Sequence, residues 1–99
     1  MERVKVYENV ETSIYYLDAS NPEIPNSDIY VAEYTNFKSK KELTDFINMR
    51  IDEIIEKYYG DKNEIEIVKN GNVLSFEFSV NDENENIMTR YKCSMSYSL

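Results

Sequence analysis

Apolar residues recur at three- and four-residue spacing between Ser39 and Tyr59, which is the pattern of an amphipathic helix. The segment Ser39–Glu42 has the sequence of a capping box, and Gly60 stands where a left-handed residue can end the helix. The sequence therefore predicts one helix of about five to six turns. Its apolar face is expected to consist of Leu43, Phe46, Ile47, Ile51, Ile54, Ile55 and Tyr58.

After the helix, polar and apolar residues alternate, first from Glu64 to Val68 and again from Leu74 to Val80. The dipeptide Asn70-Gly71 between them predicts a hairpin with a type I′ turn. The polar run from Asn81 to Asn86 predicts another turn, and the alternation from Ile87 to Tyr97 predicts a last long strand.

Three N-terminal segments are rich in Val, Ile, Tyr and Thr, as strands are. They are Arg3–Tyr7, Thr12–Leu17 and Asp28–Thr35, and the two prolines between Asn21 and Asn26 predict a loop before the third. The expected order is β-β-β-α-β-β-β in a single α+β domain spanning residues 1–99. We expect an antiparallel sheet of about five to six strands with the helix packed on one face.

The net charge of the chain indicates which class of partner to expect. The chain has 19 acidic and 11 basic residues, for a net charge of -8. A field of this sign repels phosphate backbones and anionic lipids, so we expect a protein partner with a basic surface, and neither direct nucleic-acid binding nor membrane binding. The alternative is that the acidity serves solubility.

Candidate chemistry is sparse. The absence of histidine removes the commonest general base and the commonest transition-metal ligand, and two glycines cannot build a glycine-rich phosphate loop. The run Asp82–Asn86 matches the start of a calcium loop, but Ile87 stands where glycine is needed and Cys93 where glutamate is needed. We therefore expect a protein that is not an enzyme and that uses no metal and no cofactor.

Cys93 is the only cysteine, so no intrachain disulfide is expected. By strand alternation it points inward, where a cysteine is usually a small buried hydrophobic residue rather than a reactive thiol. The N-terminus lacks the apolar region of a signal peptide, and no apolar run approaches the ~20 residues of a membrane span. These features predict a cytoplasmic protein.

The helix carries a row of carboxylates opposite its apolar face. At 100° per residue these side chains fall within an arc of roughly 100°. Such a row can imitate the phosphates of a nucleic acid in a groove lined by Arg and Lys. The alternative is an ordinary solvated helix face, with Glu53 and Lys57 as an i,i+4 pair. The candidate partner-binding residues are Glu42, Asp45, Asp52, Glu53 and Glu56, with Tyr59, one of nine tyrosines, beside them.

In size, acidity and lack of catalytic motifs, the chain is similar to small inhibitors encoded by bacteriophages and mobile elements, among them anti-CRISPR and other anti-defence proteins. The likeness covers no motif, so it assigns no residue. It implies a non-enzymatic protein-binding inhibitor that presents acids and tyrosines to a basic, nucleic-acid-binding surface. One alternative is an oligomer that sequesters a nucleotide-like anion with Arg90 or Lys92, and another is a structural subunit of a larger assembly.

Overall fold

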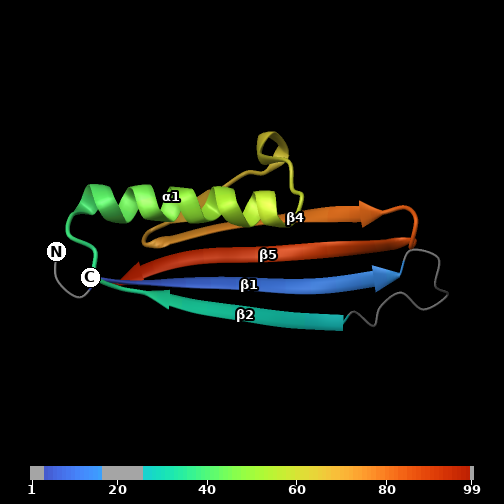
Figure 1. The fold of residues 1–99 in the computed structure, drawn as a ribbon, viewed down its shortest axis with the longest axis horizontal. Helices are drawn as coiled ribbons and strands as arrows, with labels where there is room; N and C mark the ends of the chain where they lie inside the picture. Colours follow the sequence, from blue (N-terminus) through green and yellow to red (C-terminus); the bar gives the residue numbers. More distant parts are fainter. Residues whose placement is uncertain (1–3, 17–25, 99) are drawn as a thin grey trace.

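The computed structural model of the protein describes residues 4–16 and 26–98, which form a five-stranded antiparallel sheet and one long helix (Figure 1). The strand order is β2-β1-β5-β4-β3. This confirms the expected α+β class and the antiparallel sheet with a helix on one face. The elements are β1 (Lys5–Tyr16), β2 (Asn26–Tyr34), α1 (Lys40–Lys57), the 3-10 helix η1 (Lys62–Glu64), β3 (Val68–Asn70), β4 (Val73–Asp82) and β5 (Ile87–Ser98).

The N-terminal region differs from expectation, because one strand replaces two. β1 runs without interruption through the polar stretch between Tyr7 and Thr12 and pairs along its length with β5. The observed order is therefore β-β-α-β-β-β. The ends of the two expected strands at Arg3 and Leu17, and the expected proline-containing loop up to Pro25, lie outside the described residues.

Helix α1 begins as its sequence predicts. The Ser39 side chain accepts a hydrogen bond from the Glu42 backbone N–H at 3.1 Å. The Glu42 carboxylate in turn accepts one from the backbone N–H of Lys38, one residue before the cap, also at 3.1 Å. The first bond satisfies an amide donor that the first turn of a helix leaves unpaired, and the second ties the residue before the cap to the helix. The helix is 18 residues long and is too polar to span a membrane.

The core lies between α1 and one face of the sheet. Five of the seven residues expected on the apolar helix face are buried, and Phe46 and Tyr58 are half-buried at its margins. Burying each aliphatic side chain contributes about 1.5–3 kcal/mol, so packing rather than helix propensity holds α1 in place. The sheet contributes Val6 and Val10 from β1, Phe76 from β4, and Cys93 and Met95 from β5, and Val4 joins them from just before β1.

The hairpin after the helix is shifted from its expected position. Residues from Lys62 to Glu64 form η1, so β3 is a strand of three residues that starts at Val68. The loop residues are Gly71 and Asn72, not Asn70 and Gly71, because Asn70 pairs with Val73. Of the two, Gly71 alone has a positive φ, at 61°, which is the pattern of a type II′ turn rather than a type I′ turn.

Candidate protein-binding surfaces

The acidic helix face comprises Glu42, Asp45, Asp52, Glu53 and Glu56, and all five side chains are exposed. They lie on the helix opposite the buried residues, as the periodicity predicts. From Glu42 to Glu56 the row extends about 21 Å along the helix at 1.5 Å per residue. The structure therefore brings the predicted residues onto one surface.

Four of these carboxylates have partners within the chain. Asp45 pairs with Lys41 at 2.7 Å, and Glu42 binds the backbone N–H described above. Glu53 pairs with Arg50 at 2.6 Å, and Asp52 pairs at 2.6 Å with Lys62, which η1 supplies. The acidic helix face is thus a row of alternating charges rather than a bare carboxylate stripe.

The expected pair between Glu53 and Lys57 does not form. Arg50 takes its place, because its guanidinium group is already fixed on this side of the helix by a buried carboxylate. The Lys57 ammonium group instead lies over the Tyr58 ring, 5.2 Å from its centroid. Within the described part of the chain, the Glu56 carboxylate makes no hydrogen bond or ion pair.

Tyr59 adjoins the C-terminal end of the acidic helix face and is 86% exposed. It adopts a φ of 61°, so Tyr59 rather than the expected Gly60 is the left-handed residue that ends the helix. Its N–H donates to the Glu56 carbonyl, and the Gly60 N–H donates to the Ile55 carbonyl at 2.8 Å. These two bonds form a Schellman motif, in which the left-handed position is usually glycine.

Gly60 is required for a different reason, the close approach of a neighbouring ring. A Cβ atom at this position would lie 2.9 Å from the Phe78 ring and 3.1 Å from the Ile55 side chain. The absence of a Cβ atom at Gly60 therefore lets the chain pass close over Phe78 of β4. The positive φ is adopted by Tyr59 instead. A bulky residue with positive φ is uncommon.

The most buried charged group, Glu8, is not among the residues singled out from the sequence. Its side chain is 0% exposed and faces α1 from the first half of β1. Arg50 binds it with two nitrogens, Nε at 3.0 Å and Nη2, and the Tyr34 hydroxyl donates to it at 2.7 Å. This Glu8 network joins β1, β2 and α1 and leaves no buried side-chain polar atom unpaired among the described residues.

The electrostatics of the Glu8 network extend to its neighbours. The hydrogen bond to Glu8 raises the pKa of Arg50 above its already high ordinary value. Burial, reinforced by the bond to Glu8, raises the pKa of the Tyr34 hydroxyl. Burial and, secondarily, the charge of Glu8 raise the pKa of Cys93 to about 12. Cys93 is 4% exposed, which confirms that this cysteine is buried, as the strand alternation predicts.

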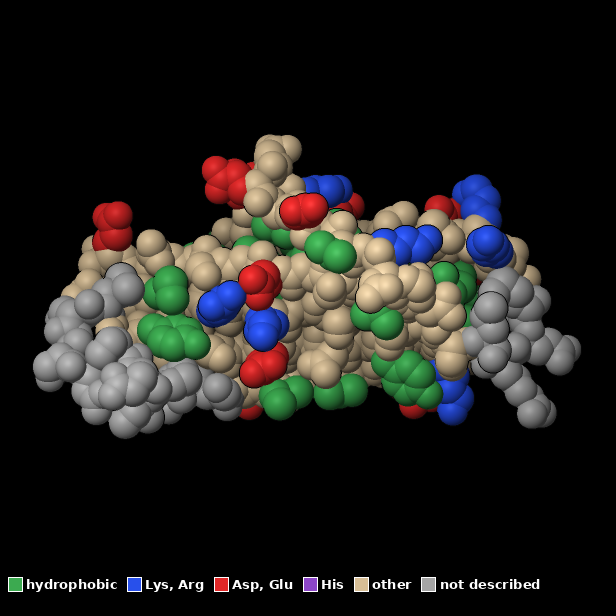
Figure 2. All heavy atoms as spheres, turned by 180° about the vertical axis from the view of Figure 1, so that it is seen from behind, with side chains coloured by type: hydrophobic (Ala, Val, Ile, Leu, Met, Phe, Trp, Pro, Cys, Tyr) green, Lys and Arg blue, Asp and Glu red, His purple; other side chains and the backbone are tan. Residues whose placement is uncertain are grey.

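The second candidate surface is the side of the sheet away from the helix, here called the open sheet face. Figure 2 shows charged side chains at its centre and apolar ones around them. Among the described elements none covers this face (Figure 1). In register, Lys92 of β5 lies between Glu11 of β1 and Glu77 of β4, and Arg90 pairs with Glu77 at 3.0 Å.

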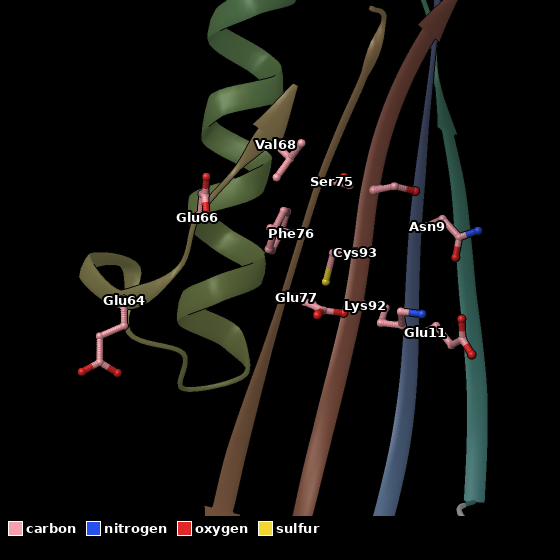
Figure 3. Close-up of a pocket in the computed structure, with 11 residues that line it drawn as sticks. Asn9, Glu11, Glu64, Glu66, Val68, Ser75, Phe76, Glu77, Lys92 and Cys93 are labelled. Carbon is pink, nitrogen blue, oxygen red and sulfur yellow. The ribbon is translucent and has the colours of Figure 1, made fainter. Parts of the chain in front are cut away.

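A hollow of about 610 Å³ lies over this charged centre (Figure 3). Four carboxylates line it against one cation, Lys92, which lies between Glu11 and Glu77. Arg90 pairs with Glu77, and Lys92 lies between Glu11 and Glu77. Since both cations are next to carboxylates, the arrangement gives no support to an anion-binding site. Among the described residues, no group of carboxylates and thiols is placed to hold a metal ion. The four acids are Glu11, Glu64, Glu66 and Glu77.

No protein-family model, no curated protein and no solved structure matches this chain. The function must therefore be inferred from the surfaces themselves.

Proposed function

We propose that the protein is a non-enzymatic inhibitor that binds a protein partner with a basic surface. The binding surface is the acidic helix face together with Tyr59. The observation that carries the proposal is the conformation of Tyr59, a large side chain that is 86% exposed and held at a φ of 61°. Folding would be served better by glycine at this position, so the tyrosine calls for another explanation.

Tyrosine suits a contact surface. It contributes a large area and a hydroxyl group at low entropic cost, and it is enriched among residues that dominate binding energy. Tyr59 lies three residues after Glu56. Glu56 is the one carboxylate of the acidic helix face that has no partner within the described chain. An arginine or lysine of the partner can pair with Glu56 while its neighbours contact the Tyr59 ring.

The internal ion pairs of the acidic helix face are compatible with binding a basic surface. The side chains of Lys41 and Asp45 are 85% and 62% exposed, and those of Lys62 and Asp52 are 63% and 51% exposed. Exposed pairs of this kind contribute about 0–1 kcal/mol each. Their carboxylates can therefore exchange a local lysine for a cation of the partner at little cost.

The net charge of -8 favours the same class of partner. It speeds the approach of a basic protein and opposes association with acidic ones. Surfaces that bind nucleic acids are lined by Lys and Arg, and a carboxylate row can occupy such a groove in place of phosphates. The proposed target is therefore a nucleic-acid-binding protein, such as a nuclease of a bacterial defence system.

The test is a competition assay with a panel of purified RNA-guided and restriction nucleases, in which duplex DNA binding and cleavage are measured. We expect the wild-type protein to displace DNA from at least one of them. The variant Asp45→Asn/Asp52→Asn/Glu56→Gln should lose this effect. Glu42 is left in place because it caps the helix, and Glu53 is left in place because it binds Arg50.

The matched control is Glu66→Gln/Glu83→Gln/Glu85→Gln, which removes the same number of charges from exposed positions outside the helix. It should inhibit as the wild type does. If both variants weaken inhibition equally, only net charge matters and the acidic helix face is not the binding surface. If the wild type displaces DNA from no nuclease and binds none of them, the proposed function is wrong.

A further inference from the structure

Strand β2 forms one edge of the sheet and exposes three consecutive large apolar side chains. Ile29 is 64% exposed, Tyr30 is 50% exposed and Val31 is 62% exposed. β2 pairs with β1 on one side, and nothing in the described part of the chain pairs with its other side. Its outer backbone N–H and C=O groups are therefore available for another strand.

The two edges of this sheet are unlike each other. β3, at the opposite edge, is three residues long and carries Lys69 at its centre. Short edges and central lysines are the usual protection against unwanted strand pairing. β2 is nine residues long and has no charged residue between Asp28 and Glu33. Beyond β3, residues 76–82 of β4 also have no described strand on their outer side, but this stretch carries Glu77 and Asp82. The long edge without a central charge is therefore β2.

We propose that β2 pairs antiparallel with β2 of a second copy of this chain, with the two-fold axis at Tyr30. The two sheets would then form one continuous sheet. This interface includes neither the acidic helix face nor Tyr59. The proposed dimer therefore does not depend on the proposed function.

The register argues for a second copy as the occupant. A two-fold axis perpendicular to the sheet maps each face of the sheet onto itself. A residue of one copy therefore lies opposite a residue of the other copy whose side chain is on the same face. Centred on Tyr30, Ile29 of each copy lies opposite Val31 of the other, and Tyr30 lies opposite Tyr30. Apolar cross-strand pairs of this kind stabilise sheets.

The same register keeps like charges apart. Asp28 falls opposite Ala32, and Glu33 falls opposite Ser27, so neither acid meets the other. Glu33 is also partly neutralised within its own chain by Lys5, at 3.4 Å. Moving the axis to Val31 would place Glu33 opposite Ile29, and moving it to Ile29 would leave Val31 opposite Ser27. The axis at Tyr30 is therefore the register that pairs all three apolar residues.

The experiment is sedimentation velocity of the full chain over a range of protein concentrations. We expect the wild type to be a dimer. The variants Ile29→Lys/Val31→Lys and Ile29→Glu/Val31→Glu should each be monomeric, because the interface then gathers like charges. Mixing the two should restore a dimer with affinity about 100-fold or more above either variant alone, since opposite charges then face each other in this register.

The matched control is Val68→Lys/Val73→Lys, which changes exposed residues of β3 and β4 on the side of the sheet far from β2. It should leave the dimer intact, and circular dichroism should show all three double variants folded. In a second measurement, Tyr30→Cys should form a disulfide-linked dimer, whereas Ile29→Cys should crosslink only to a chain carrying Val31→Cys. A monomeric wild type, or a dimer that survives both charged variants, would overturn the proposal. The proposal would also be overturned if the mixture of the two charged variants dimerised with no higher affinity than either variant alone.

Discussion

Tyr59 adopts a backbone conformation that an L-residue with a Cβ atom reaches at a cost of about 1–2 kcal/mol. Glycine pays no such steric cost, although it loses more freedom on folding. With a φ of 61° and a side chain 86% exposed, Tyr59 gives up little packing when it is truncated. We therefore expect Tyr59→Gly to raise the free energy of unfolding by about 1 kcal/mol in urea titrations.

The same substitution should weaken partner binding if Tyr59 is a contact residue, so stability and function should move in opposite directions. Tyr59→Phe is the control, because it keeps both the ring and the backbone strain and should leave stability unchanged. A loss of stability in Tyr59→Gly would mean that the ring contributes to folding. The strain would then need no functional explanation.

At the scale of the element, the Glu8 network decides how α1 lies on the sheet. Glu8 is 0% exposed, and Arg50 supplies both of its charge-assisted bonds. Arg50→Met would leave the carboxylate buried with Tyr34 as its remaining partner. Removing one member of a buried ion pair typically costs about 3–5 kcal/mol, and we expect a loss of this size by urea or thermal unfolding.

Replacing the whole network tests whether this loss comes from the unpaired charge. Glu8→Met/Arg50→Met/Tyr34→Phe should recover most of the stability, because apolar residues of similar volume often substitute for a buried pair without loss. Glu53→Gln should cost less than about 1 kcal/mol, since it breaks only an exposed pair with Arg50. An Arg50→Met variant as stable as the wild type would contradict the importance of the network.

Glu8 also explains why β1 is not predictable as one strand. Helix α1 and strands β4 and β5 follow from the sequence because each has a single apolar period and a recognisable cap or turn. In β1 the inward positions Val6, Glu8 and Val10 interrupt the apolar pattern with a charge. That charge is acceptable because of Arg50, 42 residues away, and no local pattern reveals such a partner.

The acidic helix face was predictable in its position but not in its pairing. Helix geometry places Glu53 on the exposed side, whereas the choice between Arg50 and Lys57 depends on where the buried network fixes the guanidinium group. Likewise Lys62 reaches Asp52 because the segment after Gly60 turns into η1 instead of entering a strand. Tertiary contacts therefore set the local charge pattern that a partner meets.

At the scale of the whole molecule, attraction and repulsion between charges act over different distances. The attractive ion pairs span short distances, between 2.5 Å for Glu8 with Arg50 and 3.4 Å for Lys5 with Glu33. The repulsion arises from a net charge of -8 spread over a molecule measuring 52 × 25 × 21 Å. The Debye length falls from about 30 Å at 0.01 M salt to about 8 Å at 0.15 M.

Over that range, salt removes repulsion across the molecule while leaving contacts between paired groups largely unscreened. We therefore expect the free energy of unfolding to rise by about 0.5–1 kcal/mol between the two salt concentrations, measured by urea titration. Glu66→Gln/Glu83→Gln/Glu85→Gln breaks no ion pair among the described residues and removes three negative charges, so it should be more stable than the wild type at low salt and respond less to added salt. Stability that falls with salt in both proteins would instead show that the exposed ion pairs outweigh the repulsion.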